Sequence, residues 1–350
     1  MRHTGVSSAR LESTPTTIFW GELACAADEP TIVVDAGDRV VVDTVSHEGI
    51  LEDQGRDPIA FFTARGISAA NVLSDAIAIA AEVEHDPHRQ GPHVITGPIY
   101  VRGAQPGDVL SVTVEDLELR ADYGIVSNRH GKGALPGEFP TTAEDVLSIL
   151  ARVDGDSTGS MPSGASSDLR VRFPLRPFLG TMGVAVAGDE RPHSVPPGPH
   201  GGNIDVSVLG VGSTLHLPVQ VEGALAYVGD PHYAQGDGEV ALTAFEAPLR
   251  ATLRFDVIAA EHLRAPRRLW GETADLIVPI GLHADLNEAM RECVRGAVQL
   301  LIETGMEPAY AYAYLSAAGD FAISQVVDRV VGVHGKIRKS DLIELLATPR

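Results

Sequence analysis

Short runs of β-branched and apolar residues, separated by turn residues, dominate the first three quarters of the chain. The runs at 31–35 and 39–43 flank Ala36, Gly37 and Asp38, which predicts two strands joined by a hairpin turn. Another predicted strand, at 109–114, follows a turn at 104–108. Further strands are predicted at 183–187, 204–209, 214–221 and 249–258. The 36 glycines and 23 prolines supply the turns that many short strands need, so the pattern predicts a mainly β fold.

Helical patterns are fewer and gather near the end of the chain. An Ala-rich stretch predicts a helix at 68–83, and a capping box at 141–144 predicts a short one at 146–150. Asp285 stands where a helix N-cap is expected, and Gly305 ends the pattern that follows. The apolar residues of that pattern recur on one helix face: Leu286, Met290, Val294, Ala297, Val298 and Leu301. Two more helices are predicted at 309–318 and 342–347.

The length of 350 residues fits about two domains or one large β domain. We divide the chain into an N-terminal β-rich portion, 1–175, and a C-terminal β portion, 176–350, which ends in the predicted helices. The first portion carries a helical insertion near 48–91. A stretch at 154–167, rich in Gly, Ser and Asp, is predicted to be an exposed loop.

Charge and cysteine content exclude several classes of protein. Lys plus Arg total 27 against 47 Asp plus Glu, so the formal net charge is −20. This charge disfavours nucleic acid and anionic membranes as partners and favours neutral or cationic substrates. Cys25 and Cys293 match no metal-ligand spacing, so we expect neither a disulfide scaffold nor a multi-cysteine zinc site. No run is long enough to span a membrane, and residues 1–15 lack an apolar signal-peptide core, which predicts a cytoplasmic protein.

The segment His200-Gly-Gly-Asn-Ile-Asp205 places an imidazole, an amide and a carboxylate around a pair of glycines. If it enters a strand, Asn203 and Asp205 point to the same face, as the wall of a pocket requires. The alternative is a Gly-Gly-Asn turn followed by a solvated aspartate.

A second polar segment, at 229–239, contains Asp230, His232, Gln235, Asp237 and Glu239 among glycines. Imidazole nitrogens and carboxylate oxygens are the usual ligands of Zn²⁺ and related divalent ions. The alternative is a set of ordinary acidic turns, because Gly-Asp-Gly and Asp-Pro are both common in loops.

A third cluster, at 46–57, directly follows the predicted strand that ends at Asp43. His47 could therefore sit at a strand end and face a site, whereas Glu48 is interpreted as part of a solvated acidic loop. His93 precedes a strand-like run, while the other histidines of its loop are expected at the surface. His216 is interpreted as a wall residue and His334 as a surface residue in a turn.

Five segments, in this order, resemble the acetamidase/formamidase family. They lie at 94–110, 176–184, 200–205, 229–239 and 320–328, the last followed by Gly332-Val-His334. The resemblance implies a β-rich fold with a jelly-roll-like sandwich and added α/β elements. It also implies metal-dependent hydrolysis of a small carboxamide to a carboxylate and ammonia. The stretch from 48 to 91 looks longer than in simpler acetamidases, and such an insertion would reshape the pocket.

Within this hypothesis, we assign His47, Asp205, Asp230 and His232 as ligands of a divalent ion, with Zn²⁺ preferred and Ca²⁺ as the alternative. Such an ion supplies a nucleophile at neutral pH and stabilises developing charge. Glu239 is the candidate general base. The candidate substrate-binding residues are His200, Asn203, Gln235 and His93.

Two alternatives stay open. The same metal site could hydrolyse another C–N bond, such as that of a cyclic amide. A β-sandwich could also use these acidic loops to bind Ca²⁺ or a sugar without catalysis. We further predict a homo-oligomer, because the helices near the C-terminus carry apolar faces that need partners.

Overall fold

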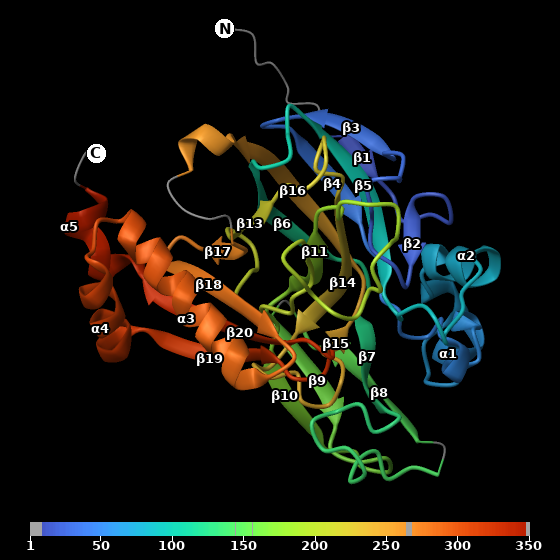
Figure 1. Ribbon diagram of the computed structural model, residues 1–350. Helices are drawn as coiled ribbons and strands as arrows, with labels where there is room; N and C mark the ends of the chain where they lie inside the picture. Colours follow the sequence, from blue (N-terminus) through green and yellow to red (C-terminus); the bar gives the residue numbers. More distant parts are fainter. Residues whose placement is uncertain (1–8, 144, 156, 264–267, 348–350) are drawn as a thin grey trace, which may run out of the picture.

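Two large β-sheets make up most of the protein. The computed structural model describes residues 9–143, 145–155, 157–263 and 268–347, and within these residues it is mainly β. The first sheet contains, in spatial order, β1 (Ala9–Leu11), β4 (Arg39–Asp43), β16 (Leu249–Ile258), β6 (Val109–Leu119), β13 (Thr214–Pro218), β17 (Trp270–Glu272), β18 (Leu276–His283), β20 (Val331–Arg338) and β19 (Asp320–Gln325). This sheet runs across the upper and left parts of Figure 1.

The second sheet contains, in order, β10 (Arg170–Pro174), β9 (Thr158–Pro162), β8 (Val146–Val153), β7 (Tyr123–Arg129), β15 (Phe245–Glu246), β14 (Ala226–Ala234), β11 (Phe178–Gly183) and β12 (Gly201–Asn203). It branches at β5 (Val94–Arg102), which pairs with β14 and also with β2 (Ile18–Trp20) and β3 (Ile32–Asp35). Both sheets take strands from either side of residue 175. The division into two portions at that residue stays a prediction.

The two sheets share one hydrophobic core. On β16 the side chains alternate, and Leu253 and Phe255 are fully buried. They belong to the same cluster as Val40 on β4, Ile99 on β5 and Val228 on β14. Apolar faces from both sheets therefore meet as in a β-sandwich. The predicted fold class, mainly β with sandwich elements and helices near the C-terminus, is confirmed.

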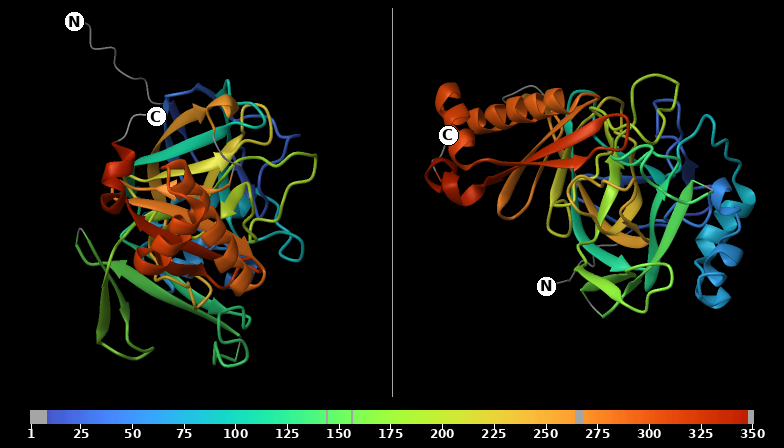
Figure 2. Two further views of the ribbon diagram at one scale, coloured as in Figure 1. Left: turned by 60° about the vertical axis from the view of Figure 1, so that its left-hand side comes forward. Right: turned by 90° about the horizontal axis from the view of Figure 1, so that it is seen from below.

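The helices near the C-terminus cover one end of the first sheet (Figures 1 and 2). They are α3 (Leu286–Glu303), α4 (Pro308–Ala318) and α5 (Ile343–Leu346), the last preceded by the 3₁₀ turn η4 (Lys339–Leu342). The predicted cap is confirmed, because Asp285 accepts hydrogen bonds from the backbone N–H groups of Asn287 and Glu288. Gly281 on β18 lets α3 approach closely, since a Cβ there would collide with Ala289 and Cys293.

The buried face of α3 is rotated relative to the prediction. Ala297 and Leu301 are buried as expected, but Leu286 and Met290 are exposed. The buried positions in the first turns are Ala289 and Cys293, which pack against Val333 of β20. Small residues face the sheet because β18 lies too close for leucine or methionine.

Helices α1 (Pro58–Thr63) and α2 (Ser74–Glu82) lie at the opposite end of the molecule from α3 (Figure 1). Helix α2 is shorter than the helix predicted at 68–83, and a 3₁₀ turn, η2 (Ala69–Asn71), precedes it. The sequence pattern gave no signal for α1. Further 3₁₀ turns are η1 (Glu52–Gln54) and η3 (Ala260–His262).

The hairpin predicted at 31–43 is wrong. A turn does form, with the Asp38 N–H donating to the Asp35 carbonyl, but it connects the two sheets. β3 runs parallel to β5, whereas β4 pairs with β1 and β16. Both runs are apolar because each enters a different layer of the sandwich.

Other local predictions were also wrong. Residues 146–150 belong to β8, which pairs with β7 along its whole length, so tertiary pairing overrides the capping signal. That signal included Glu144, which lies outside the described residues. The stretch at 154–167 contains β9 rather than only a loop. The strand predicted at 183–187 lies earlier, at β11, and no strand covers 204–209.

No helix among the described residues is both long enough and apolar enough to cross a bilayer.

Candidate active site

Strand β14 carries the centre of the site, with Asp230 and His232 both buried. His232 lies opposite Phe178 of β11 on one side and opposite Glu246 of β15 on the other. Asp230 and His232 are two residues apart on this strand, so both side chains point to the same face. They are 3.1 Å apart at Oδ2 and Nε2, and the backbone of Asp230 is left-handed, with φ of 50°.

Gly180 on β11 forms the floor beneath these side chains. A Cβ on Gly180 would lie 2.5 Å from Asp205 Oδ1, 2.7 Å from Asp230 Oδ2 and 2.7 Å from His232 Cε1. Its carbonyl accepts the backbone N–H groups of Ile204 and Asp205, which fixes the next loop against the strand. Two carboxylates thus converge above a residue that has no side chain. This convergence is unfavourable unless a positive charge lies between them.

His47 and His93 line the other side of Asp230. His47 Nδ1 lies 3.6 Å from Asp230 Oδ1 and 4.0 Å from Glu246 Oε2. His93 Nε2 lies 4.0 Å from Asp230 Oδ2, and its ring meets the His47 ring edge to face, with centroids 5.3 Å apart. The hydroxyl of Ser194, 3.0 Å from His93 Nδ1, orients the second ring.

Three groups of side chains among the described residues bring their ligand atoms within 4.8 Å of one another. The groups are His47, His93 and Asp230; Asp230, His232 and Glu246; and Asp205, His232 and Glu239. The four residues assigned as ligands from the sequence thus lie around one centre, but divided among these groups.

Several atoms of the site are buried without a hydrogen-bond partner. They are His47 Nδ1, both carboxylate oxygens of Asp205, Asp230 Oδ1, His232 Nδ1 and Glu246 Oε2. Buried polar atoms are nearly always paired, so such a concentration of unpaired ones is typical of a ligand-binding site. Carboxylate oxygens and imidazole nitrogens form the donor set that divalent cations prefer. These residues fit a metal ion.

The acids of the site have unequal proton affinities. Burial, together with the charge of Glu239, raises the pKa of Asp205 well above its usual range. Burial likewise raises the pKa of Glu239, helped by Asp328, which itself has a pKa of about 7 because of its burial. For Asp230, burial is outweighed by His232 and His93, which hold its pKa well below the usual range.

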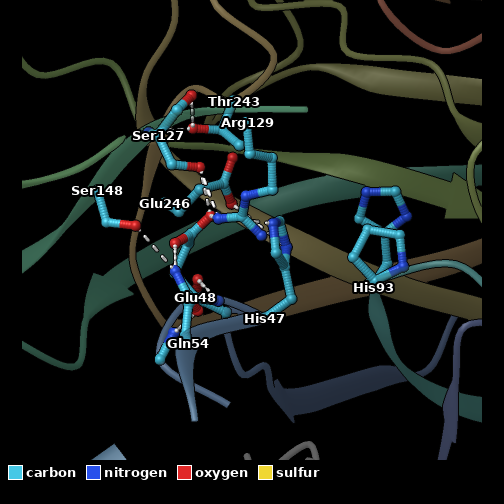
Figure 3. Close-up of polar contacts among 12 residues, drawn as sticks. His47, Glu48, Gln54, His93, Ser127, Arg129, Ser148, Thr243 and Glu246 are labelled. Carbon is cyan, nitrogen blue, oxygen red and sulfur yellow. Dashed lines mark hydrogen bonds and ion pairs between the residues drawn. The ribbon is translucent and has the colours of Figure 1, made fainter. Parts of the chain in front are cut away.

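Glu48, interpreted from the sequence as solvated, is in fact buried beside His47 (Figure 3). It accepts hydrogen bonds from Arg129, from Gln54 and from the hydroxyl of Ser127, and its Oε1 lies 3.5 Å from His47 Nε2. Burial would raise the pKa of Glu48, but the Arg129 guanidinium outweighs it and lowers the pKa to about 2. Glu48 therefore stays ionised and fixes the imidazole of His47.

A cavity of about 620 Å³ opens directly onto the site. Of the predicted residues, His47, His93, Asn203, Asp230 and Glu239 line it. Residues from the 48–91 segment, with Leu51 and His85 among them, form part of its wall. That segment therefore shapes the cavity.

Two predicted substrate-binding residues do not line this cavity. His200 packs against glycines, with its Nε2 buried and unpartnered. Gln235 donates both hydrogens of its amide to backbone carbonyls, those of Asp205 and Ser324, so it braces the Asp205 loop. Asn203 accepts a hydrogen bond from Thr181, and it ends β12, whereas Asp205 has a left-handed backbone instead of continuing a strand.

Sequence reasoning missed Glu246 and Asp328, which are both buried and line the cavity. Asp328 lies in one of the five segments used for the resemblance, so a signal existed. The sequence contains no such signal for Glu246, because this residue reaches the site only through the pairing of β15 with β14, which places it opposite His232. His334, expected at the surface, is fully buried and bonded to Ser324. The wall position of His216 fits, since it contacts Ser111 and Glu272 and stacks on Trp270.

Comparison with known protein families shows to which family the chain belongs. The model of the acetamidase/formamidase family matches residues 79–190 and 186–332, which include all the site residues except His47 and its neighbours. The chain belongs to the acetamidase/formamidase family. The resemblance stated from the sequence is thereby confirmed.

Individual relatives agree with this assignment. An acetamidase of Mycolicibacterium smegmatis is 28% identical over 198 residues, covering 42% of this chain and 49% of the relative. A formamidase of Methylophilus methylotrophus is 30% identical over 191 residues, covering 42% and 47%. The chain thus matches about half the length of these curated relatives. A solved structure described as a predicted acetamidase/formamidase from Thermoanaerobacter tengcongensis shares the fold, with a TM-score of 0.76, 23% identity and coverage of 98% and 100%.

Replacing Glu48 with glutamine should destabilise the protein. The change removes the nearer counter-charge of the buried Arg129 and leaves only Asp53 at 3.8 Å, and breaking a buried ion pair typically costs about 3–5 kcal/mol. Because the pKa of Glu48 is lowered on folding, its contribution to stability is present above its ordinary pKa and is lost as the pH falls towards about 2. Urea unfolding at neutral pH measures the loss. Glu12→Gln, at an exposed ion pair with Arg10, is the control and should cost less than about 1 kcal/mol. Equal losses in the two variants would contradict a buried charge pair.

Proposed function

We propose that the protein hydrolyses the C–N bond of a small carboxamide and releases ammonia and a carboxylate. Membership of the acetamidase/formamidase family supports this reaction class. The observation that carries the proposal is the set of buried, unpartnered carboxylate and imidazole atoms around Asp230, which opens onto a cavity. Such a site combines groups that hold a cation with groups that accept and donate protons.

The proposed cation site is centred on Asp230, with His47, His93 and Glu246 around it. The nitrogen–oxygen separations of 3.6–4.0 Å from Asp230 to the two histidines are near those expected for ligands of one small cation, about 3.3–3.5 Å when each bond is about 2.0–2.2 Å long. His232 and Asp205 continue the cluster on its inner side. A divalent cation bound there, with Zn²⁺ preferred for this donor set, would activate water and polarise the amide carbonyl.

Glu239 is the proposed general base. It is buried, lies within the group formed with Asp205 and His232, and lines the cavity. Burial raises its pKa well above the usual range, as suits a carboxyl group that takes a proton and later returns it. It would take the proton of the attacking water and deliver it to the leaving nitrogen. Asn203 and Asp328, which also line the cavity, would bind the amide group.

We also propose that the protein is a homo-oligomer. Tyr310 and Tyr312 of α4 are 68% and 65% exposed, and Leu286 and Met290 of α3 are also exposed. Light scattering coupled to gel filtration should give a mass above 37 kDa, and a monomer mass would contradict the proposal. The cytoplasmic location stays a prediction.

Removal of metal should abolish activity. Protein treated with a chelator should release no ammonia from a panel of small linear amides, and added Zn²⁺ should restore the release. Other divalent ions, tested in parallel, identify the ion that supports the fastest turnover. Undiminished release from metal-free protein would contradict metal dependence. Ring opening of a cyclic amide without ammonia release would instead favour the alternative C–N bond, and ligand binding with no reaction would favour a binding protein.

Glu239→Gln should abolish ammonia release while leaving the bound metal content unchanged. Glutamine keeps the size of the side chain but cannot accept the proton of the water. Loss of a general base typically lowers the rate by about 10²–10⁴-fold. Metal analysis of the purified variant checks the cation site, and Glu222→Gln, outside the cavity, is the matched control. A Glu239→Gln variant with wild-type activity would rule out this role.

A further inference from the structure

The cavity is much larger than the simplest amides need. Its volume of about 620 Å³ lies within the range of about 300–1,000 Å³ that is typical of sites for drug-sized ligands. Formamide and acetamide have only a few non-hydrogen atoms and would fill a small part of it. The remainder of the cavity is thus available to a substrate with a second functional group, and its lining indicates which group.

Lys132 lies on the cavity wall and has no acidic partner among the described residues. The chain contains only three lysines, and the other two are paired: Lys336 with Asp237 at 3.1 Å and Lys339 with Glu272 at 2.7 Å. Lys132 follows β7, whose last residue, Arg129, accepts the Lys132 backbone N–H through its carbonyl. The same loop therefore carries the buried Arg129 guanidinium and, three residues later, an exposed ammonium.

Arg329 lines the same cavity and likewise has no ion pair among the residues that the structure describes. It follows Asp328 in a tight turn, and its backbone is left-handed, with φ of 65°. The buried side chain of Gln325 braces this turn, accepting the backbone N–H groups of Val327 and Asp328 and donating to the Val330 carbonyl. A non-glycine residue keeps this unfavourable backbone conformation only where the surrounding contacts hold it, so the position of the Arg329 backbone is fixed by this turn.

Two acids of the cavity wall, Glu52 and Asp53, already have partners. Glu52 is paired with His85 and Arg56, and Asp53 is paired with His130. Lys132 and Arg329 are thus left as uncompensated positive charges in a protein of net charge −20. Both charges also act on the same neighbouring side chain, His193. Burial lowers the pKa of His193, and the positive charges of Arg329 and Lys132 lower it further.

The cavity lining therefore carries groups of opposite charge. Its buried side chains include the carboxylates around Asp230, whereas Lys132 and Arg329 are exposed and have no ion pair among the described residues. We propose that the substrate is a carboxamide that bears a carboxylate at its other end, bound with the neutral amide towards Asp230 and the carboxylate between Lys132 and Arg329. This inference rests on the proposed amidase function. The overall charge favoured neutral or cationic substrates, but a local pair of cations in a cleft outweighs a distant net charge that salt screens.

The test compares two amides of equal length, the monoamide of succinic acid and butanamide. The ratio of their kcat/KM values for ammonia release should favour the monoamide by about tenfold or more, as charge-assisted contacts to two cations imply. In the double variant Lys132→Gln, Arg329→Gln the ratio should fall by about tenfold. The conservative variants Lys132→Arg and Arg329→Lys should keep the preference, and Lys339→Gln, outside the cavity, should leave both rates unchanged. High salt should reduce the preference of the wild-type protein.

A second readout makes the result independent of turnover. Calorimetry measures binding of the monoamide to the metal-loaded Glu239→Gln protein, with and without the two cation substitutions. We expect binding that weakens about tenfold or more when the cations are removed. Ammonia release from butanamide with no preference for the monoamide, or an affinity that the cation substitutions leave unchanged, would overturn this inference. If no amide is hydrolysed, the proposed function fails, and the calorimetry alone decides whether the cavity binds a carboxylate.

Discussion

Negative charge buried in the interior is the constraint on which the site depends. Moving a carboxylate from water into the protein interior costs about several kcal/mol, unless a counter-charge or hydrogen bonds replace its hydration. Around Asp230 the chain places imidazoles, from His47, His93 and His232, and it pairs the buried guanidinium of Arg129 with Glu48 instead. An imidazole can release its proton and bind a cation, whereas a guanidinium cannot. The imidazoles around Asp230 are therefore compatible with the cation that we propose there, as a guanidinium would not be.

The sandwich holds this charge through unusual backbone geometry. Asp205, Asp230 and Glu239 all have left-handed backbones, with φ of 49°, 50° and 47°. Such conformations cost about 1–3 kcal/mol each and persist only where the surrounding structure determines them. Here the determinants are the ladder of β14 with β5 and β11 and the bonds from Gly180 to the Asp205 loop. Pairing within the second sheet and the bonds to Gly180 therefore hold Asp230 and Asp205 in their positions.

The sequence predicted the parts of the fold that depend on local pattern and missed the parts that depend on pairing. β16 and the cap of α3 follow directly from alternation and from Asp285. β8 does not, because its partner β7 overrides a helical signal, and neither does the separation of β3 from β4 into two sheets. In the site, compact polar motifs identified Asp230, His232 and Glu239.

The remaining site residues could be found only in three dimensions. Glu246 is isolated in the sequence and becomes significant through its register with His232. Glu48 looked like one of several acids in a loop, and nothing local indicated that Arg129 would bury it. His200 and Gln235 belong to the right motifs but face glycines and backbone carbonyls, respectively.

The interleaving of strands also determines when the cavity can exist. The hydrogen bond between Thr44 and Leu249 spans 205 positions, and β4, near the start of the chain, pairs with β16. Contacts of such long range slow folding, because the loop must close before the contact stabilises anything. During synthesis, His47 emerges from the ribosome long before Asp230 or Asp328. Its partners arrive only when nearly the whole chain is available, so the cavity is completed as one of the last steps of folding.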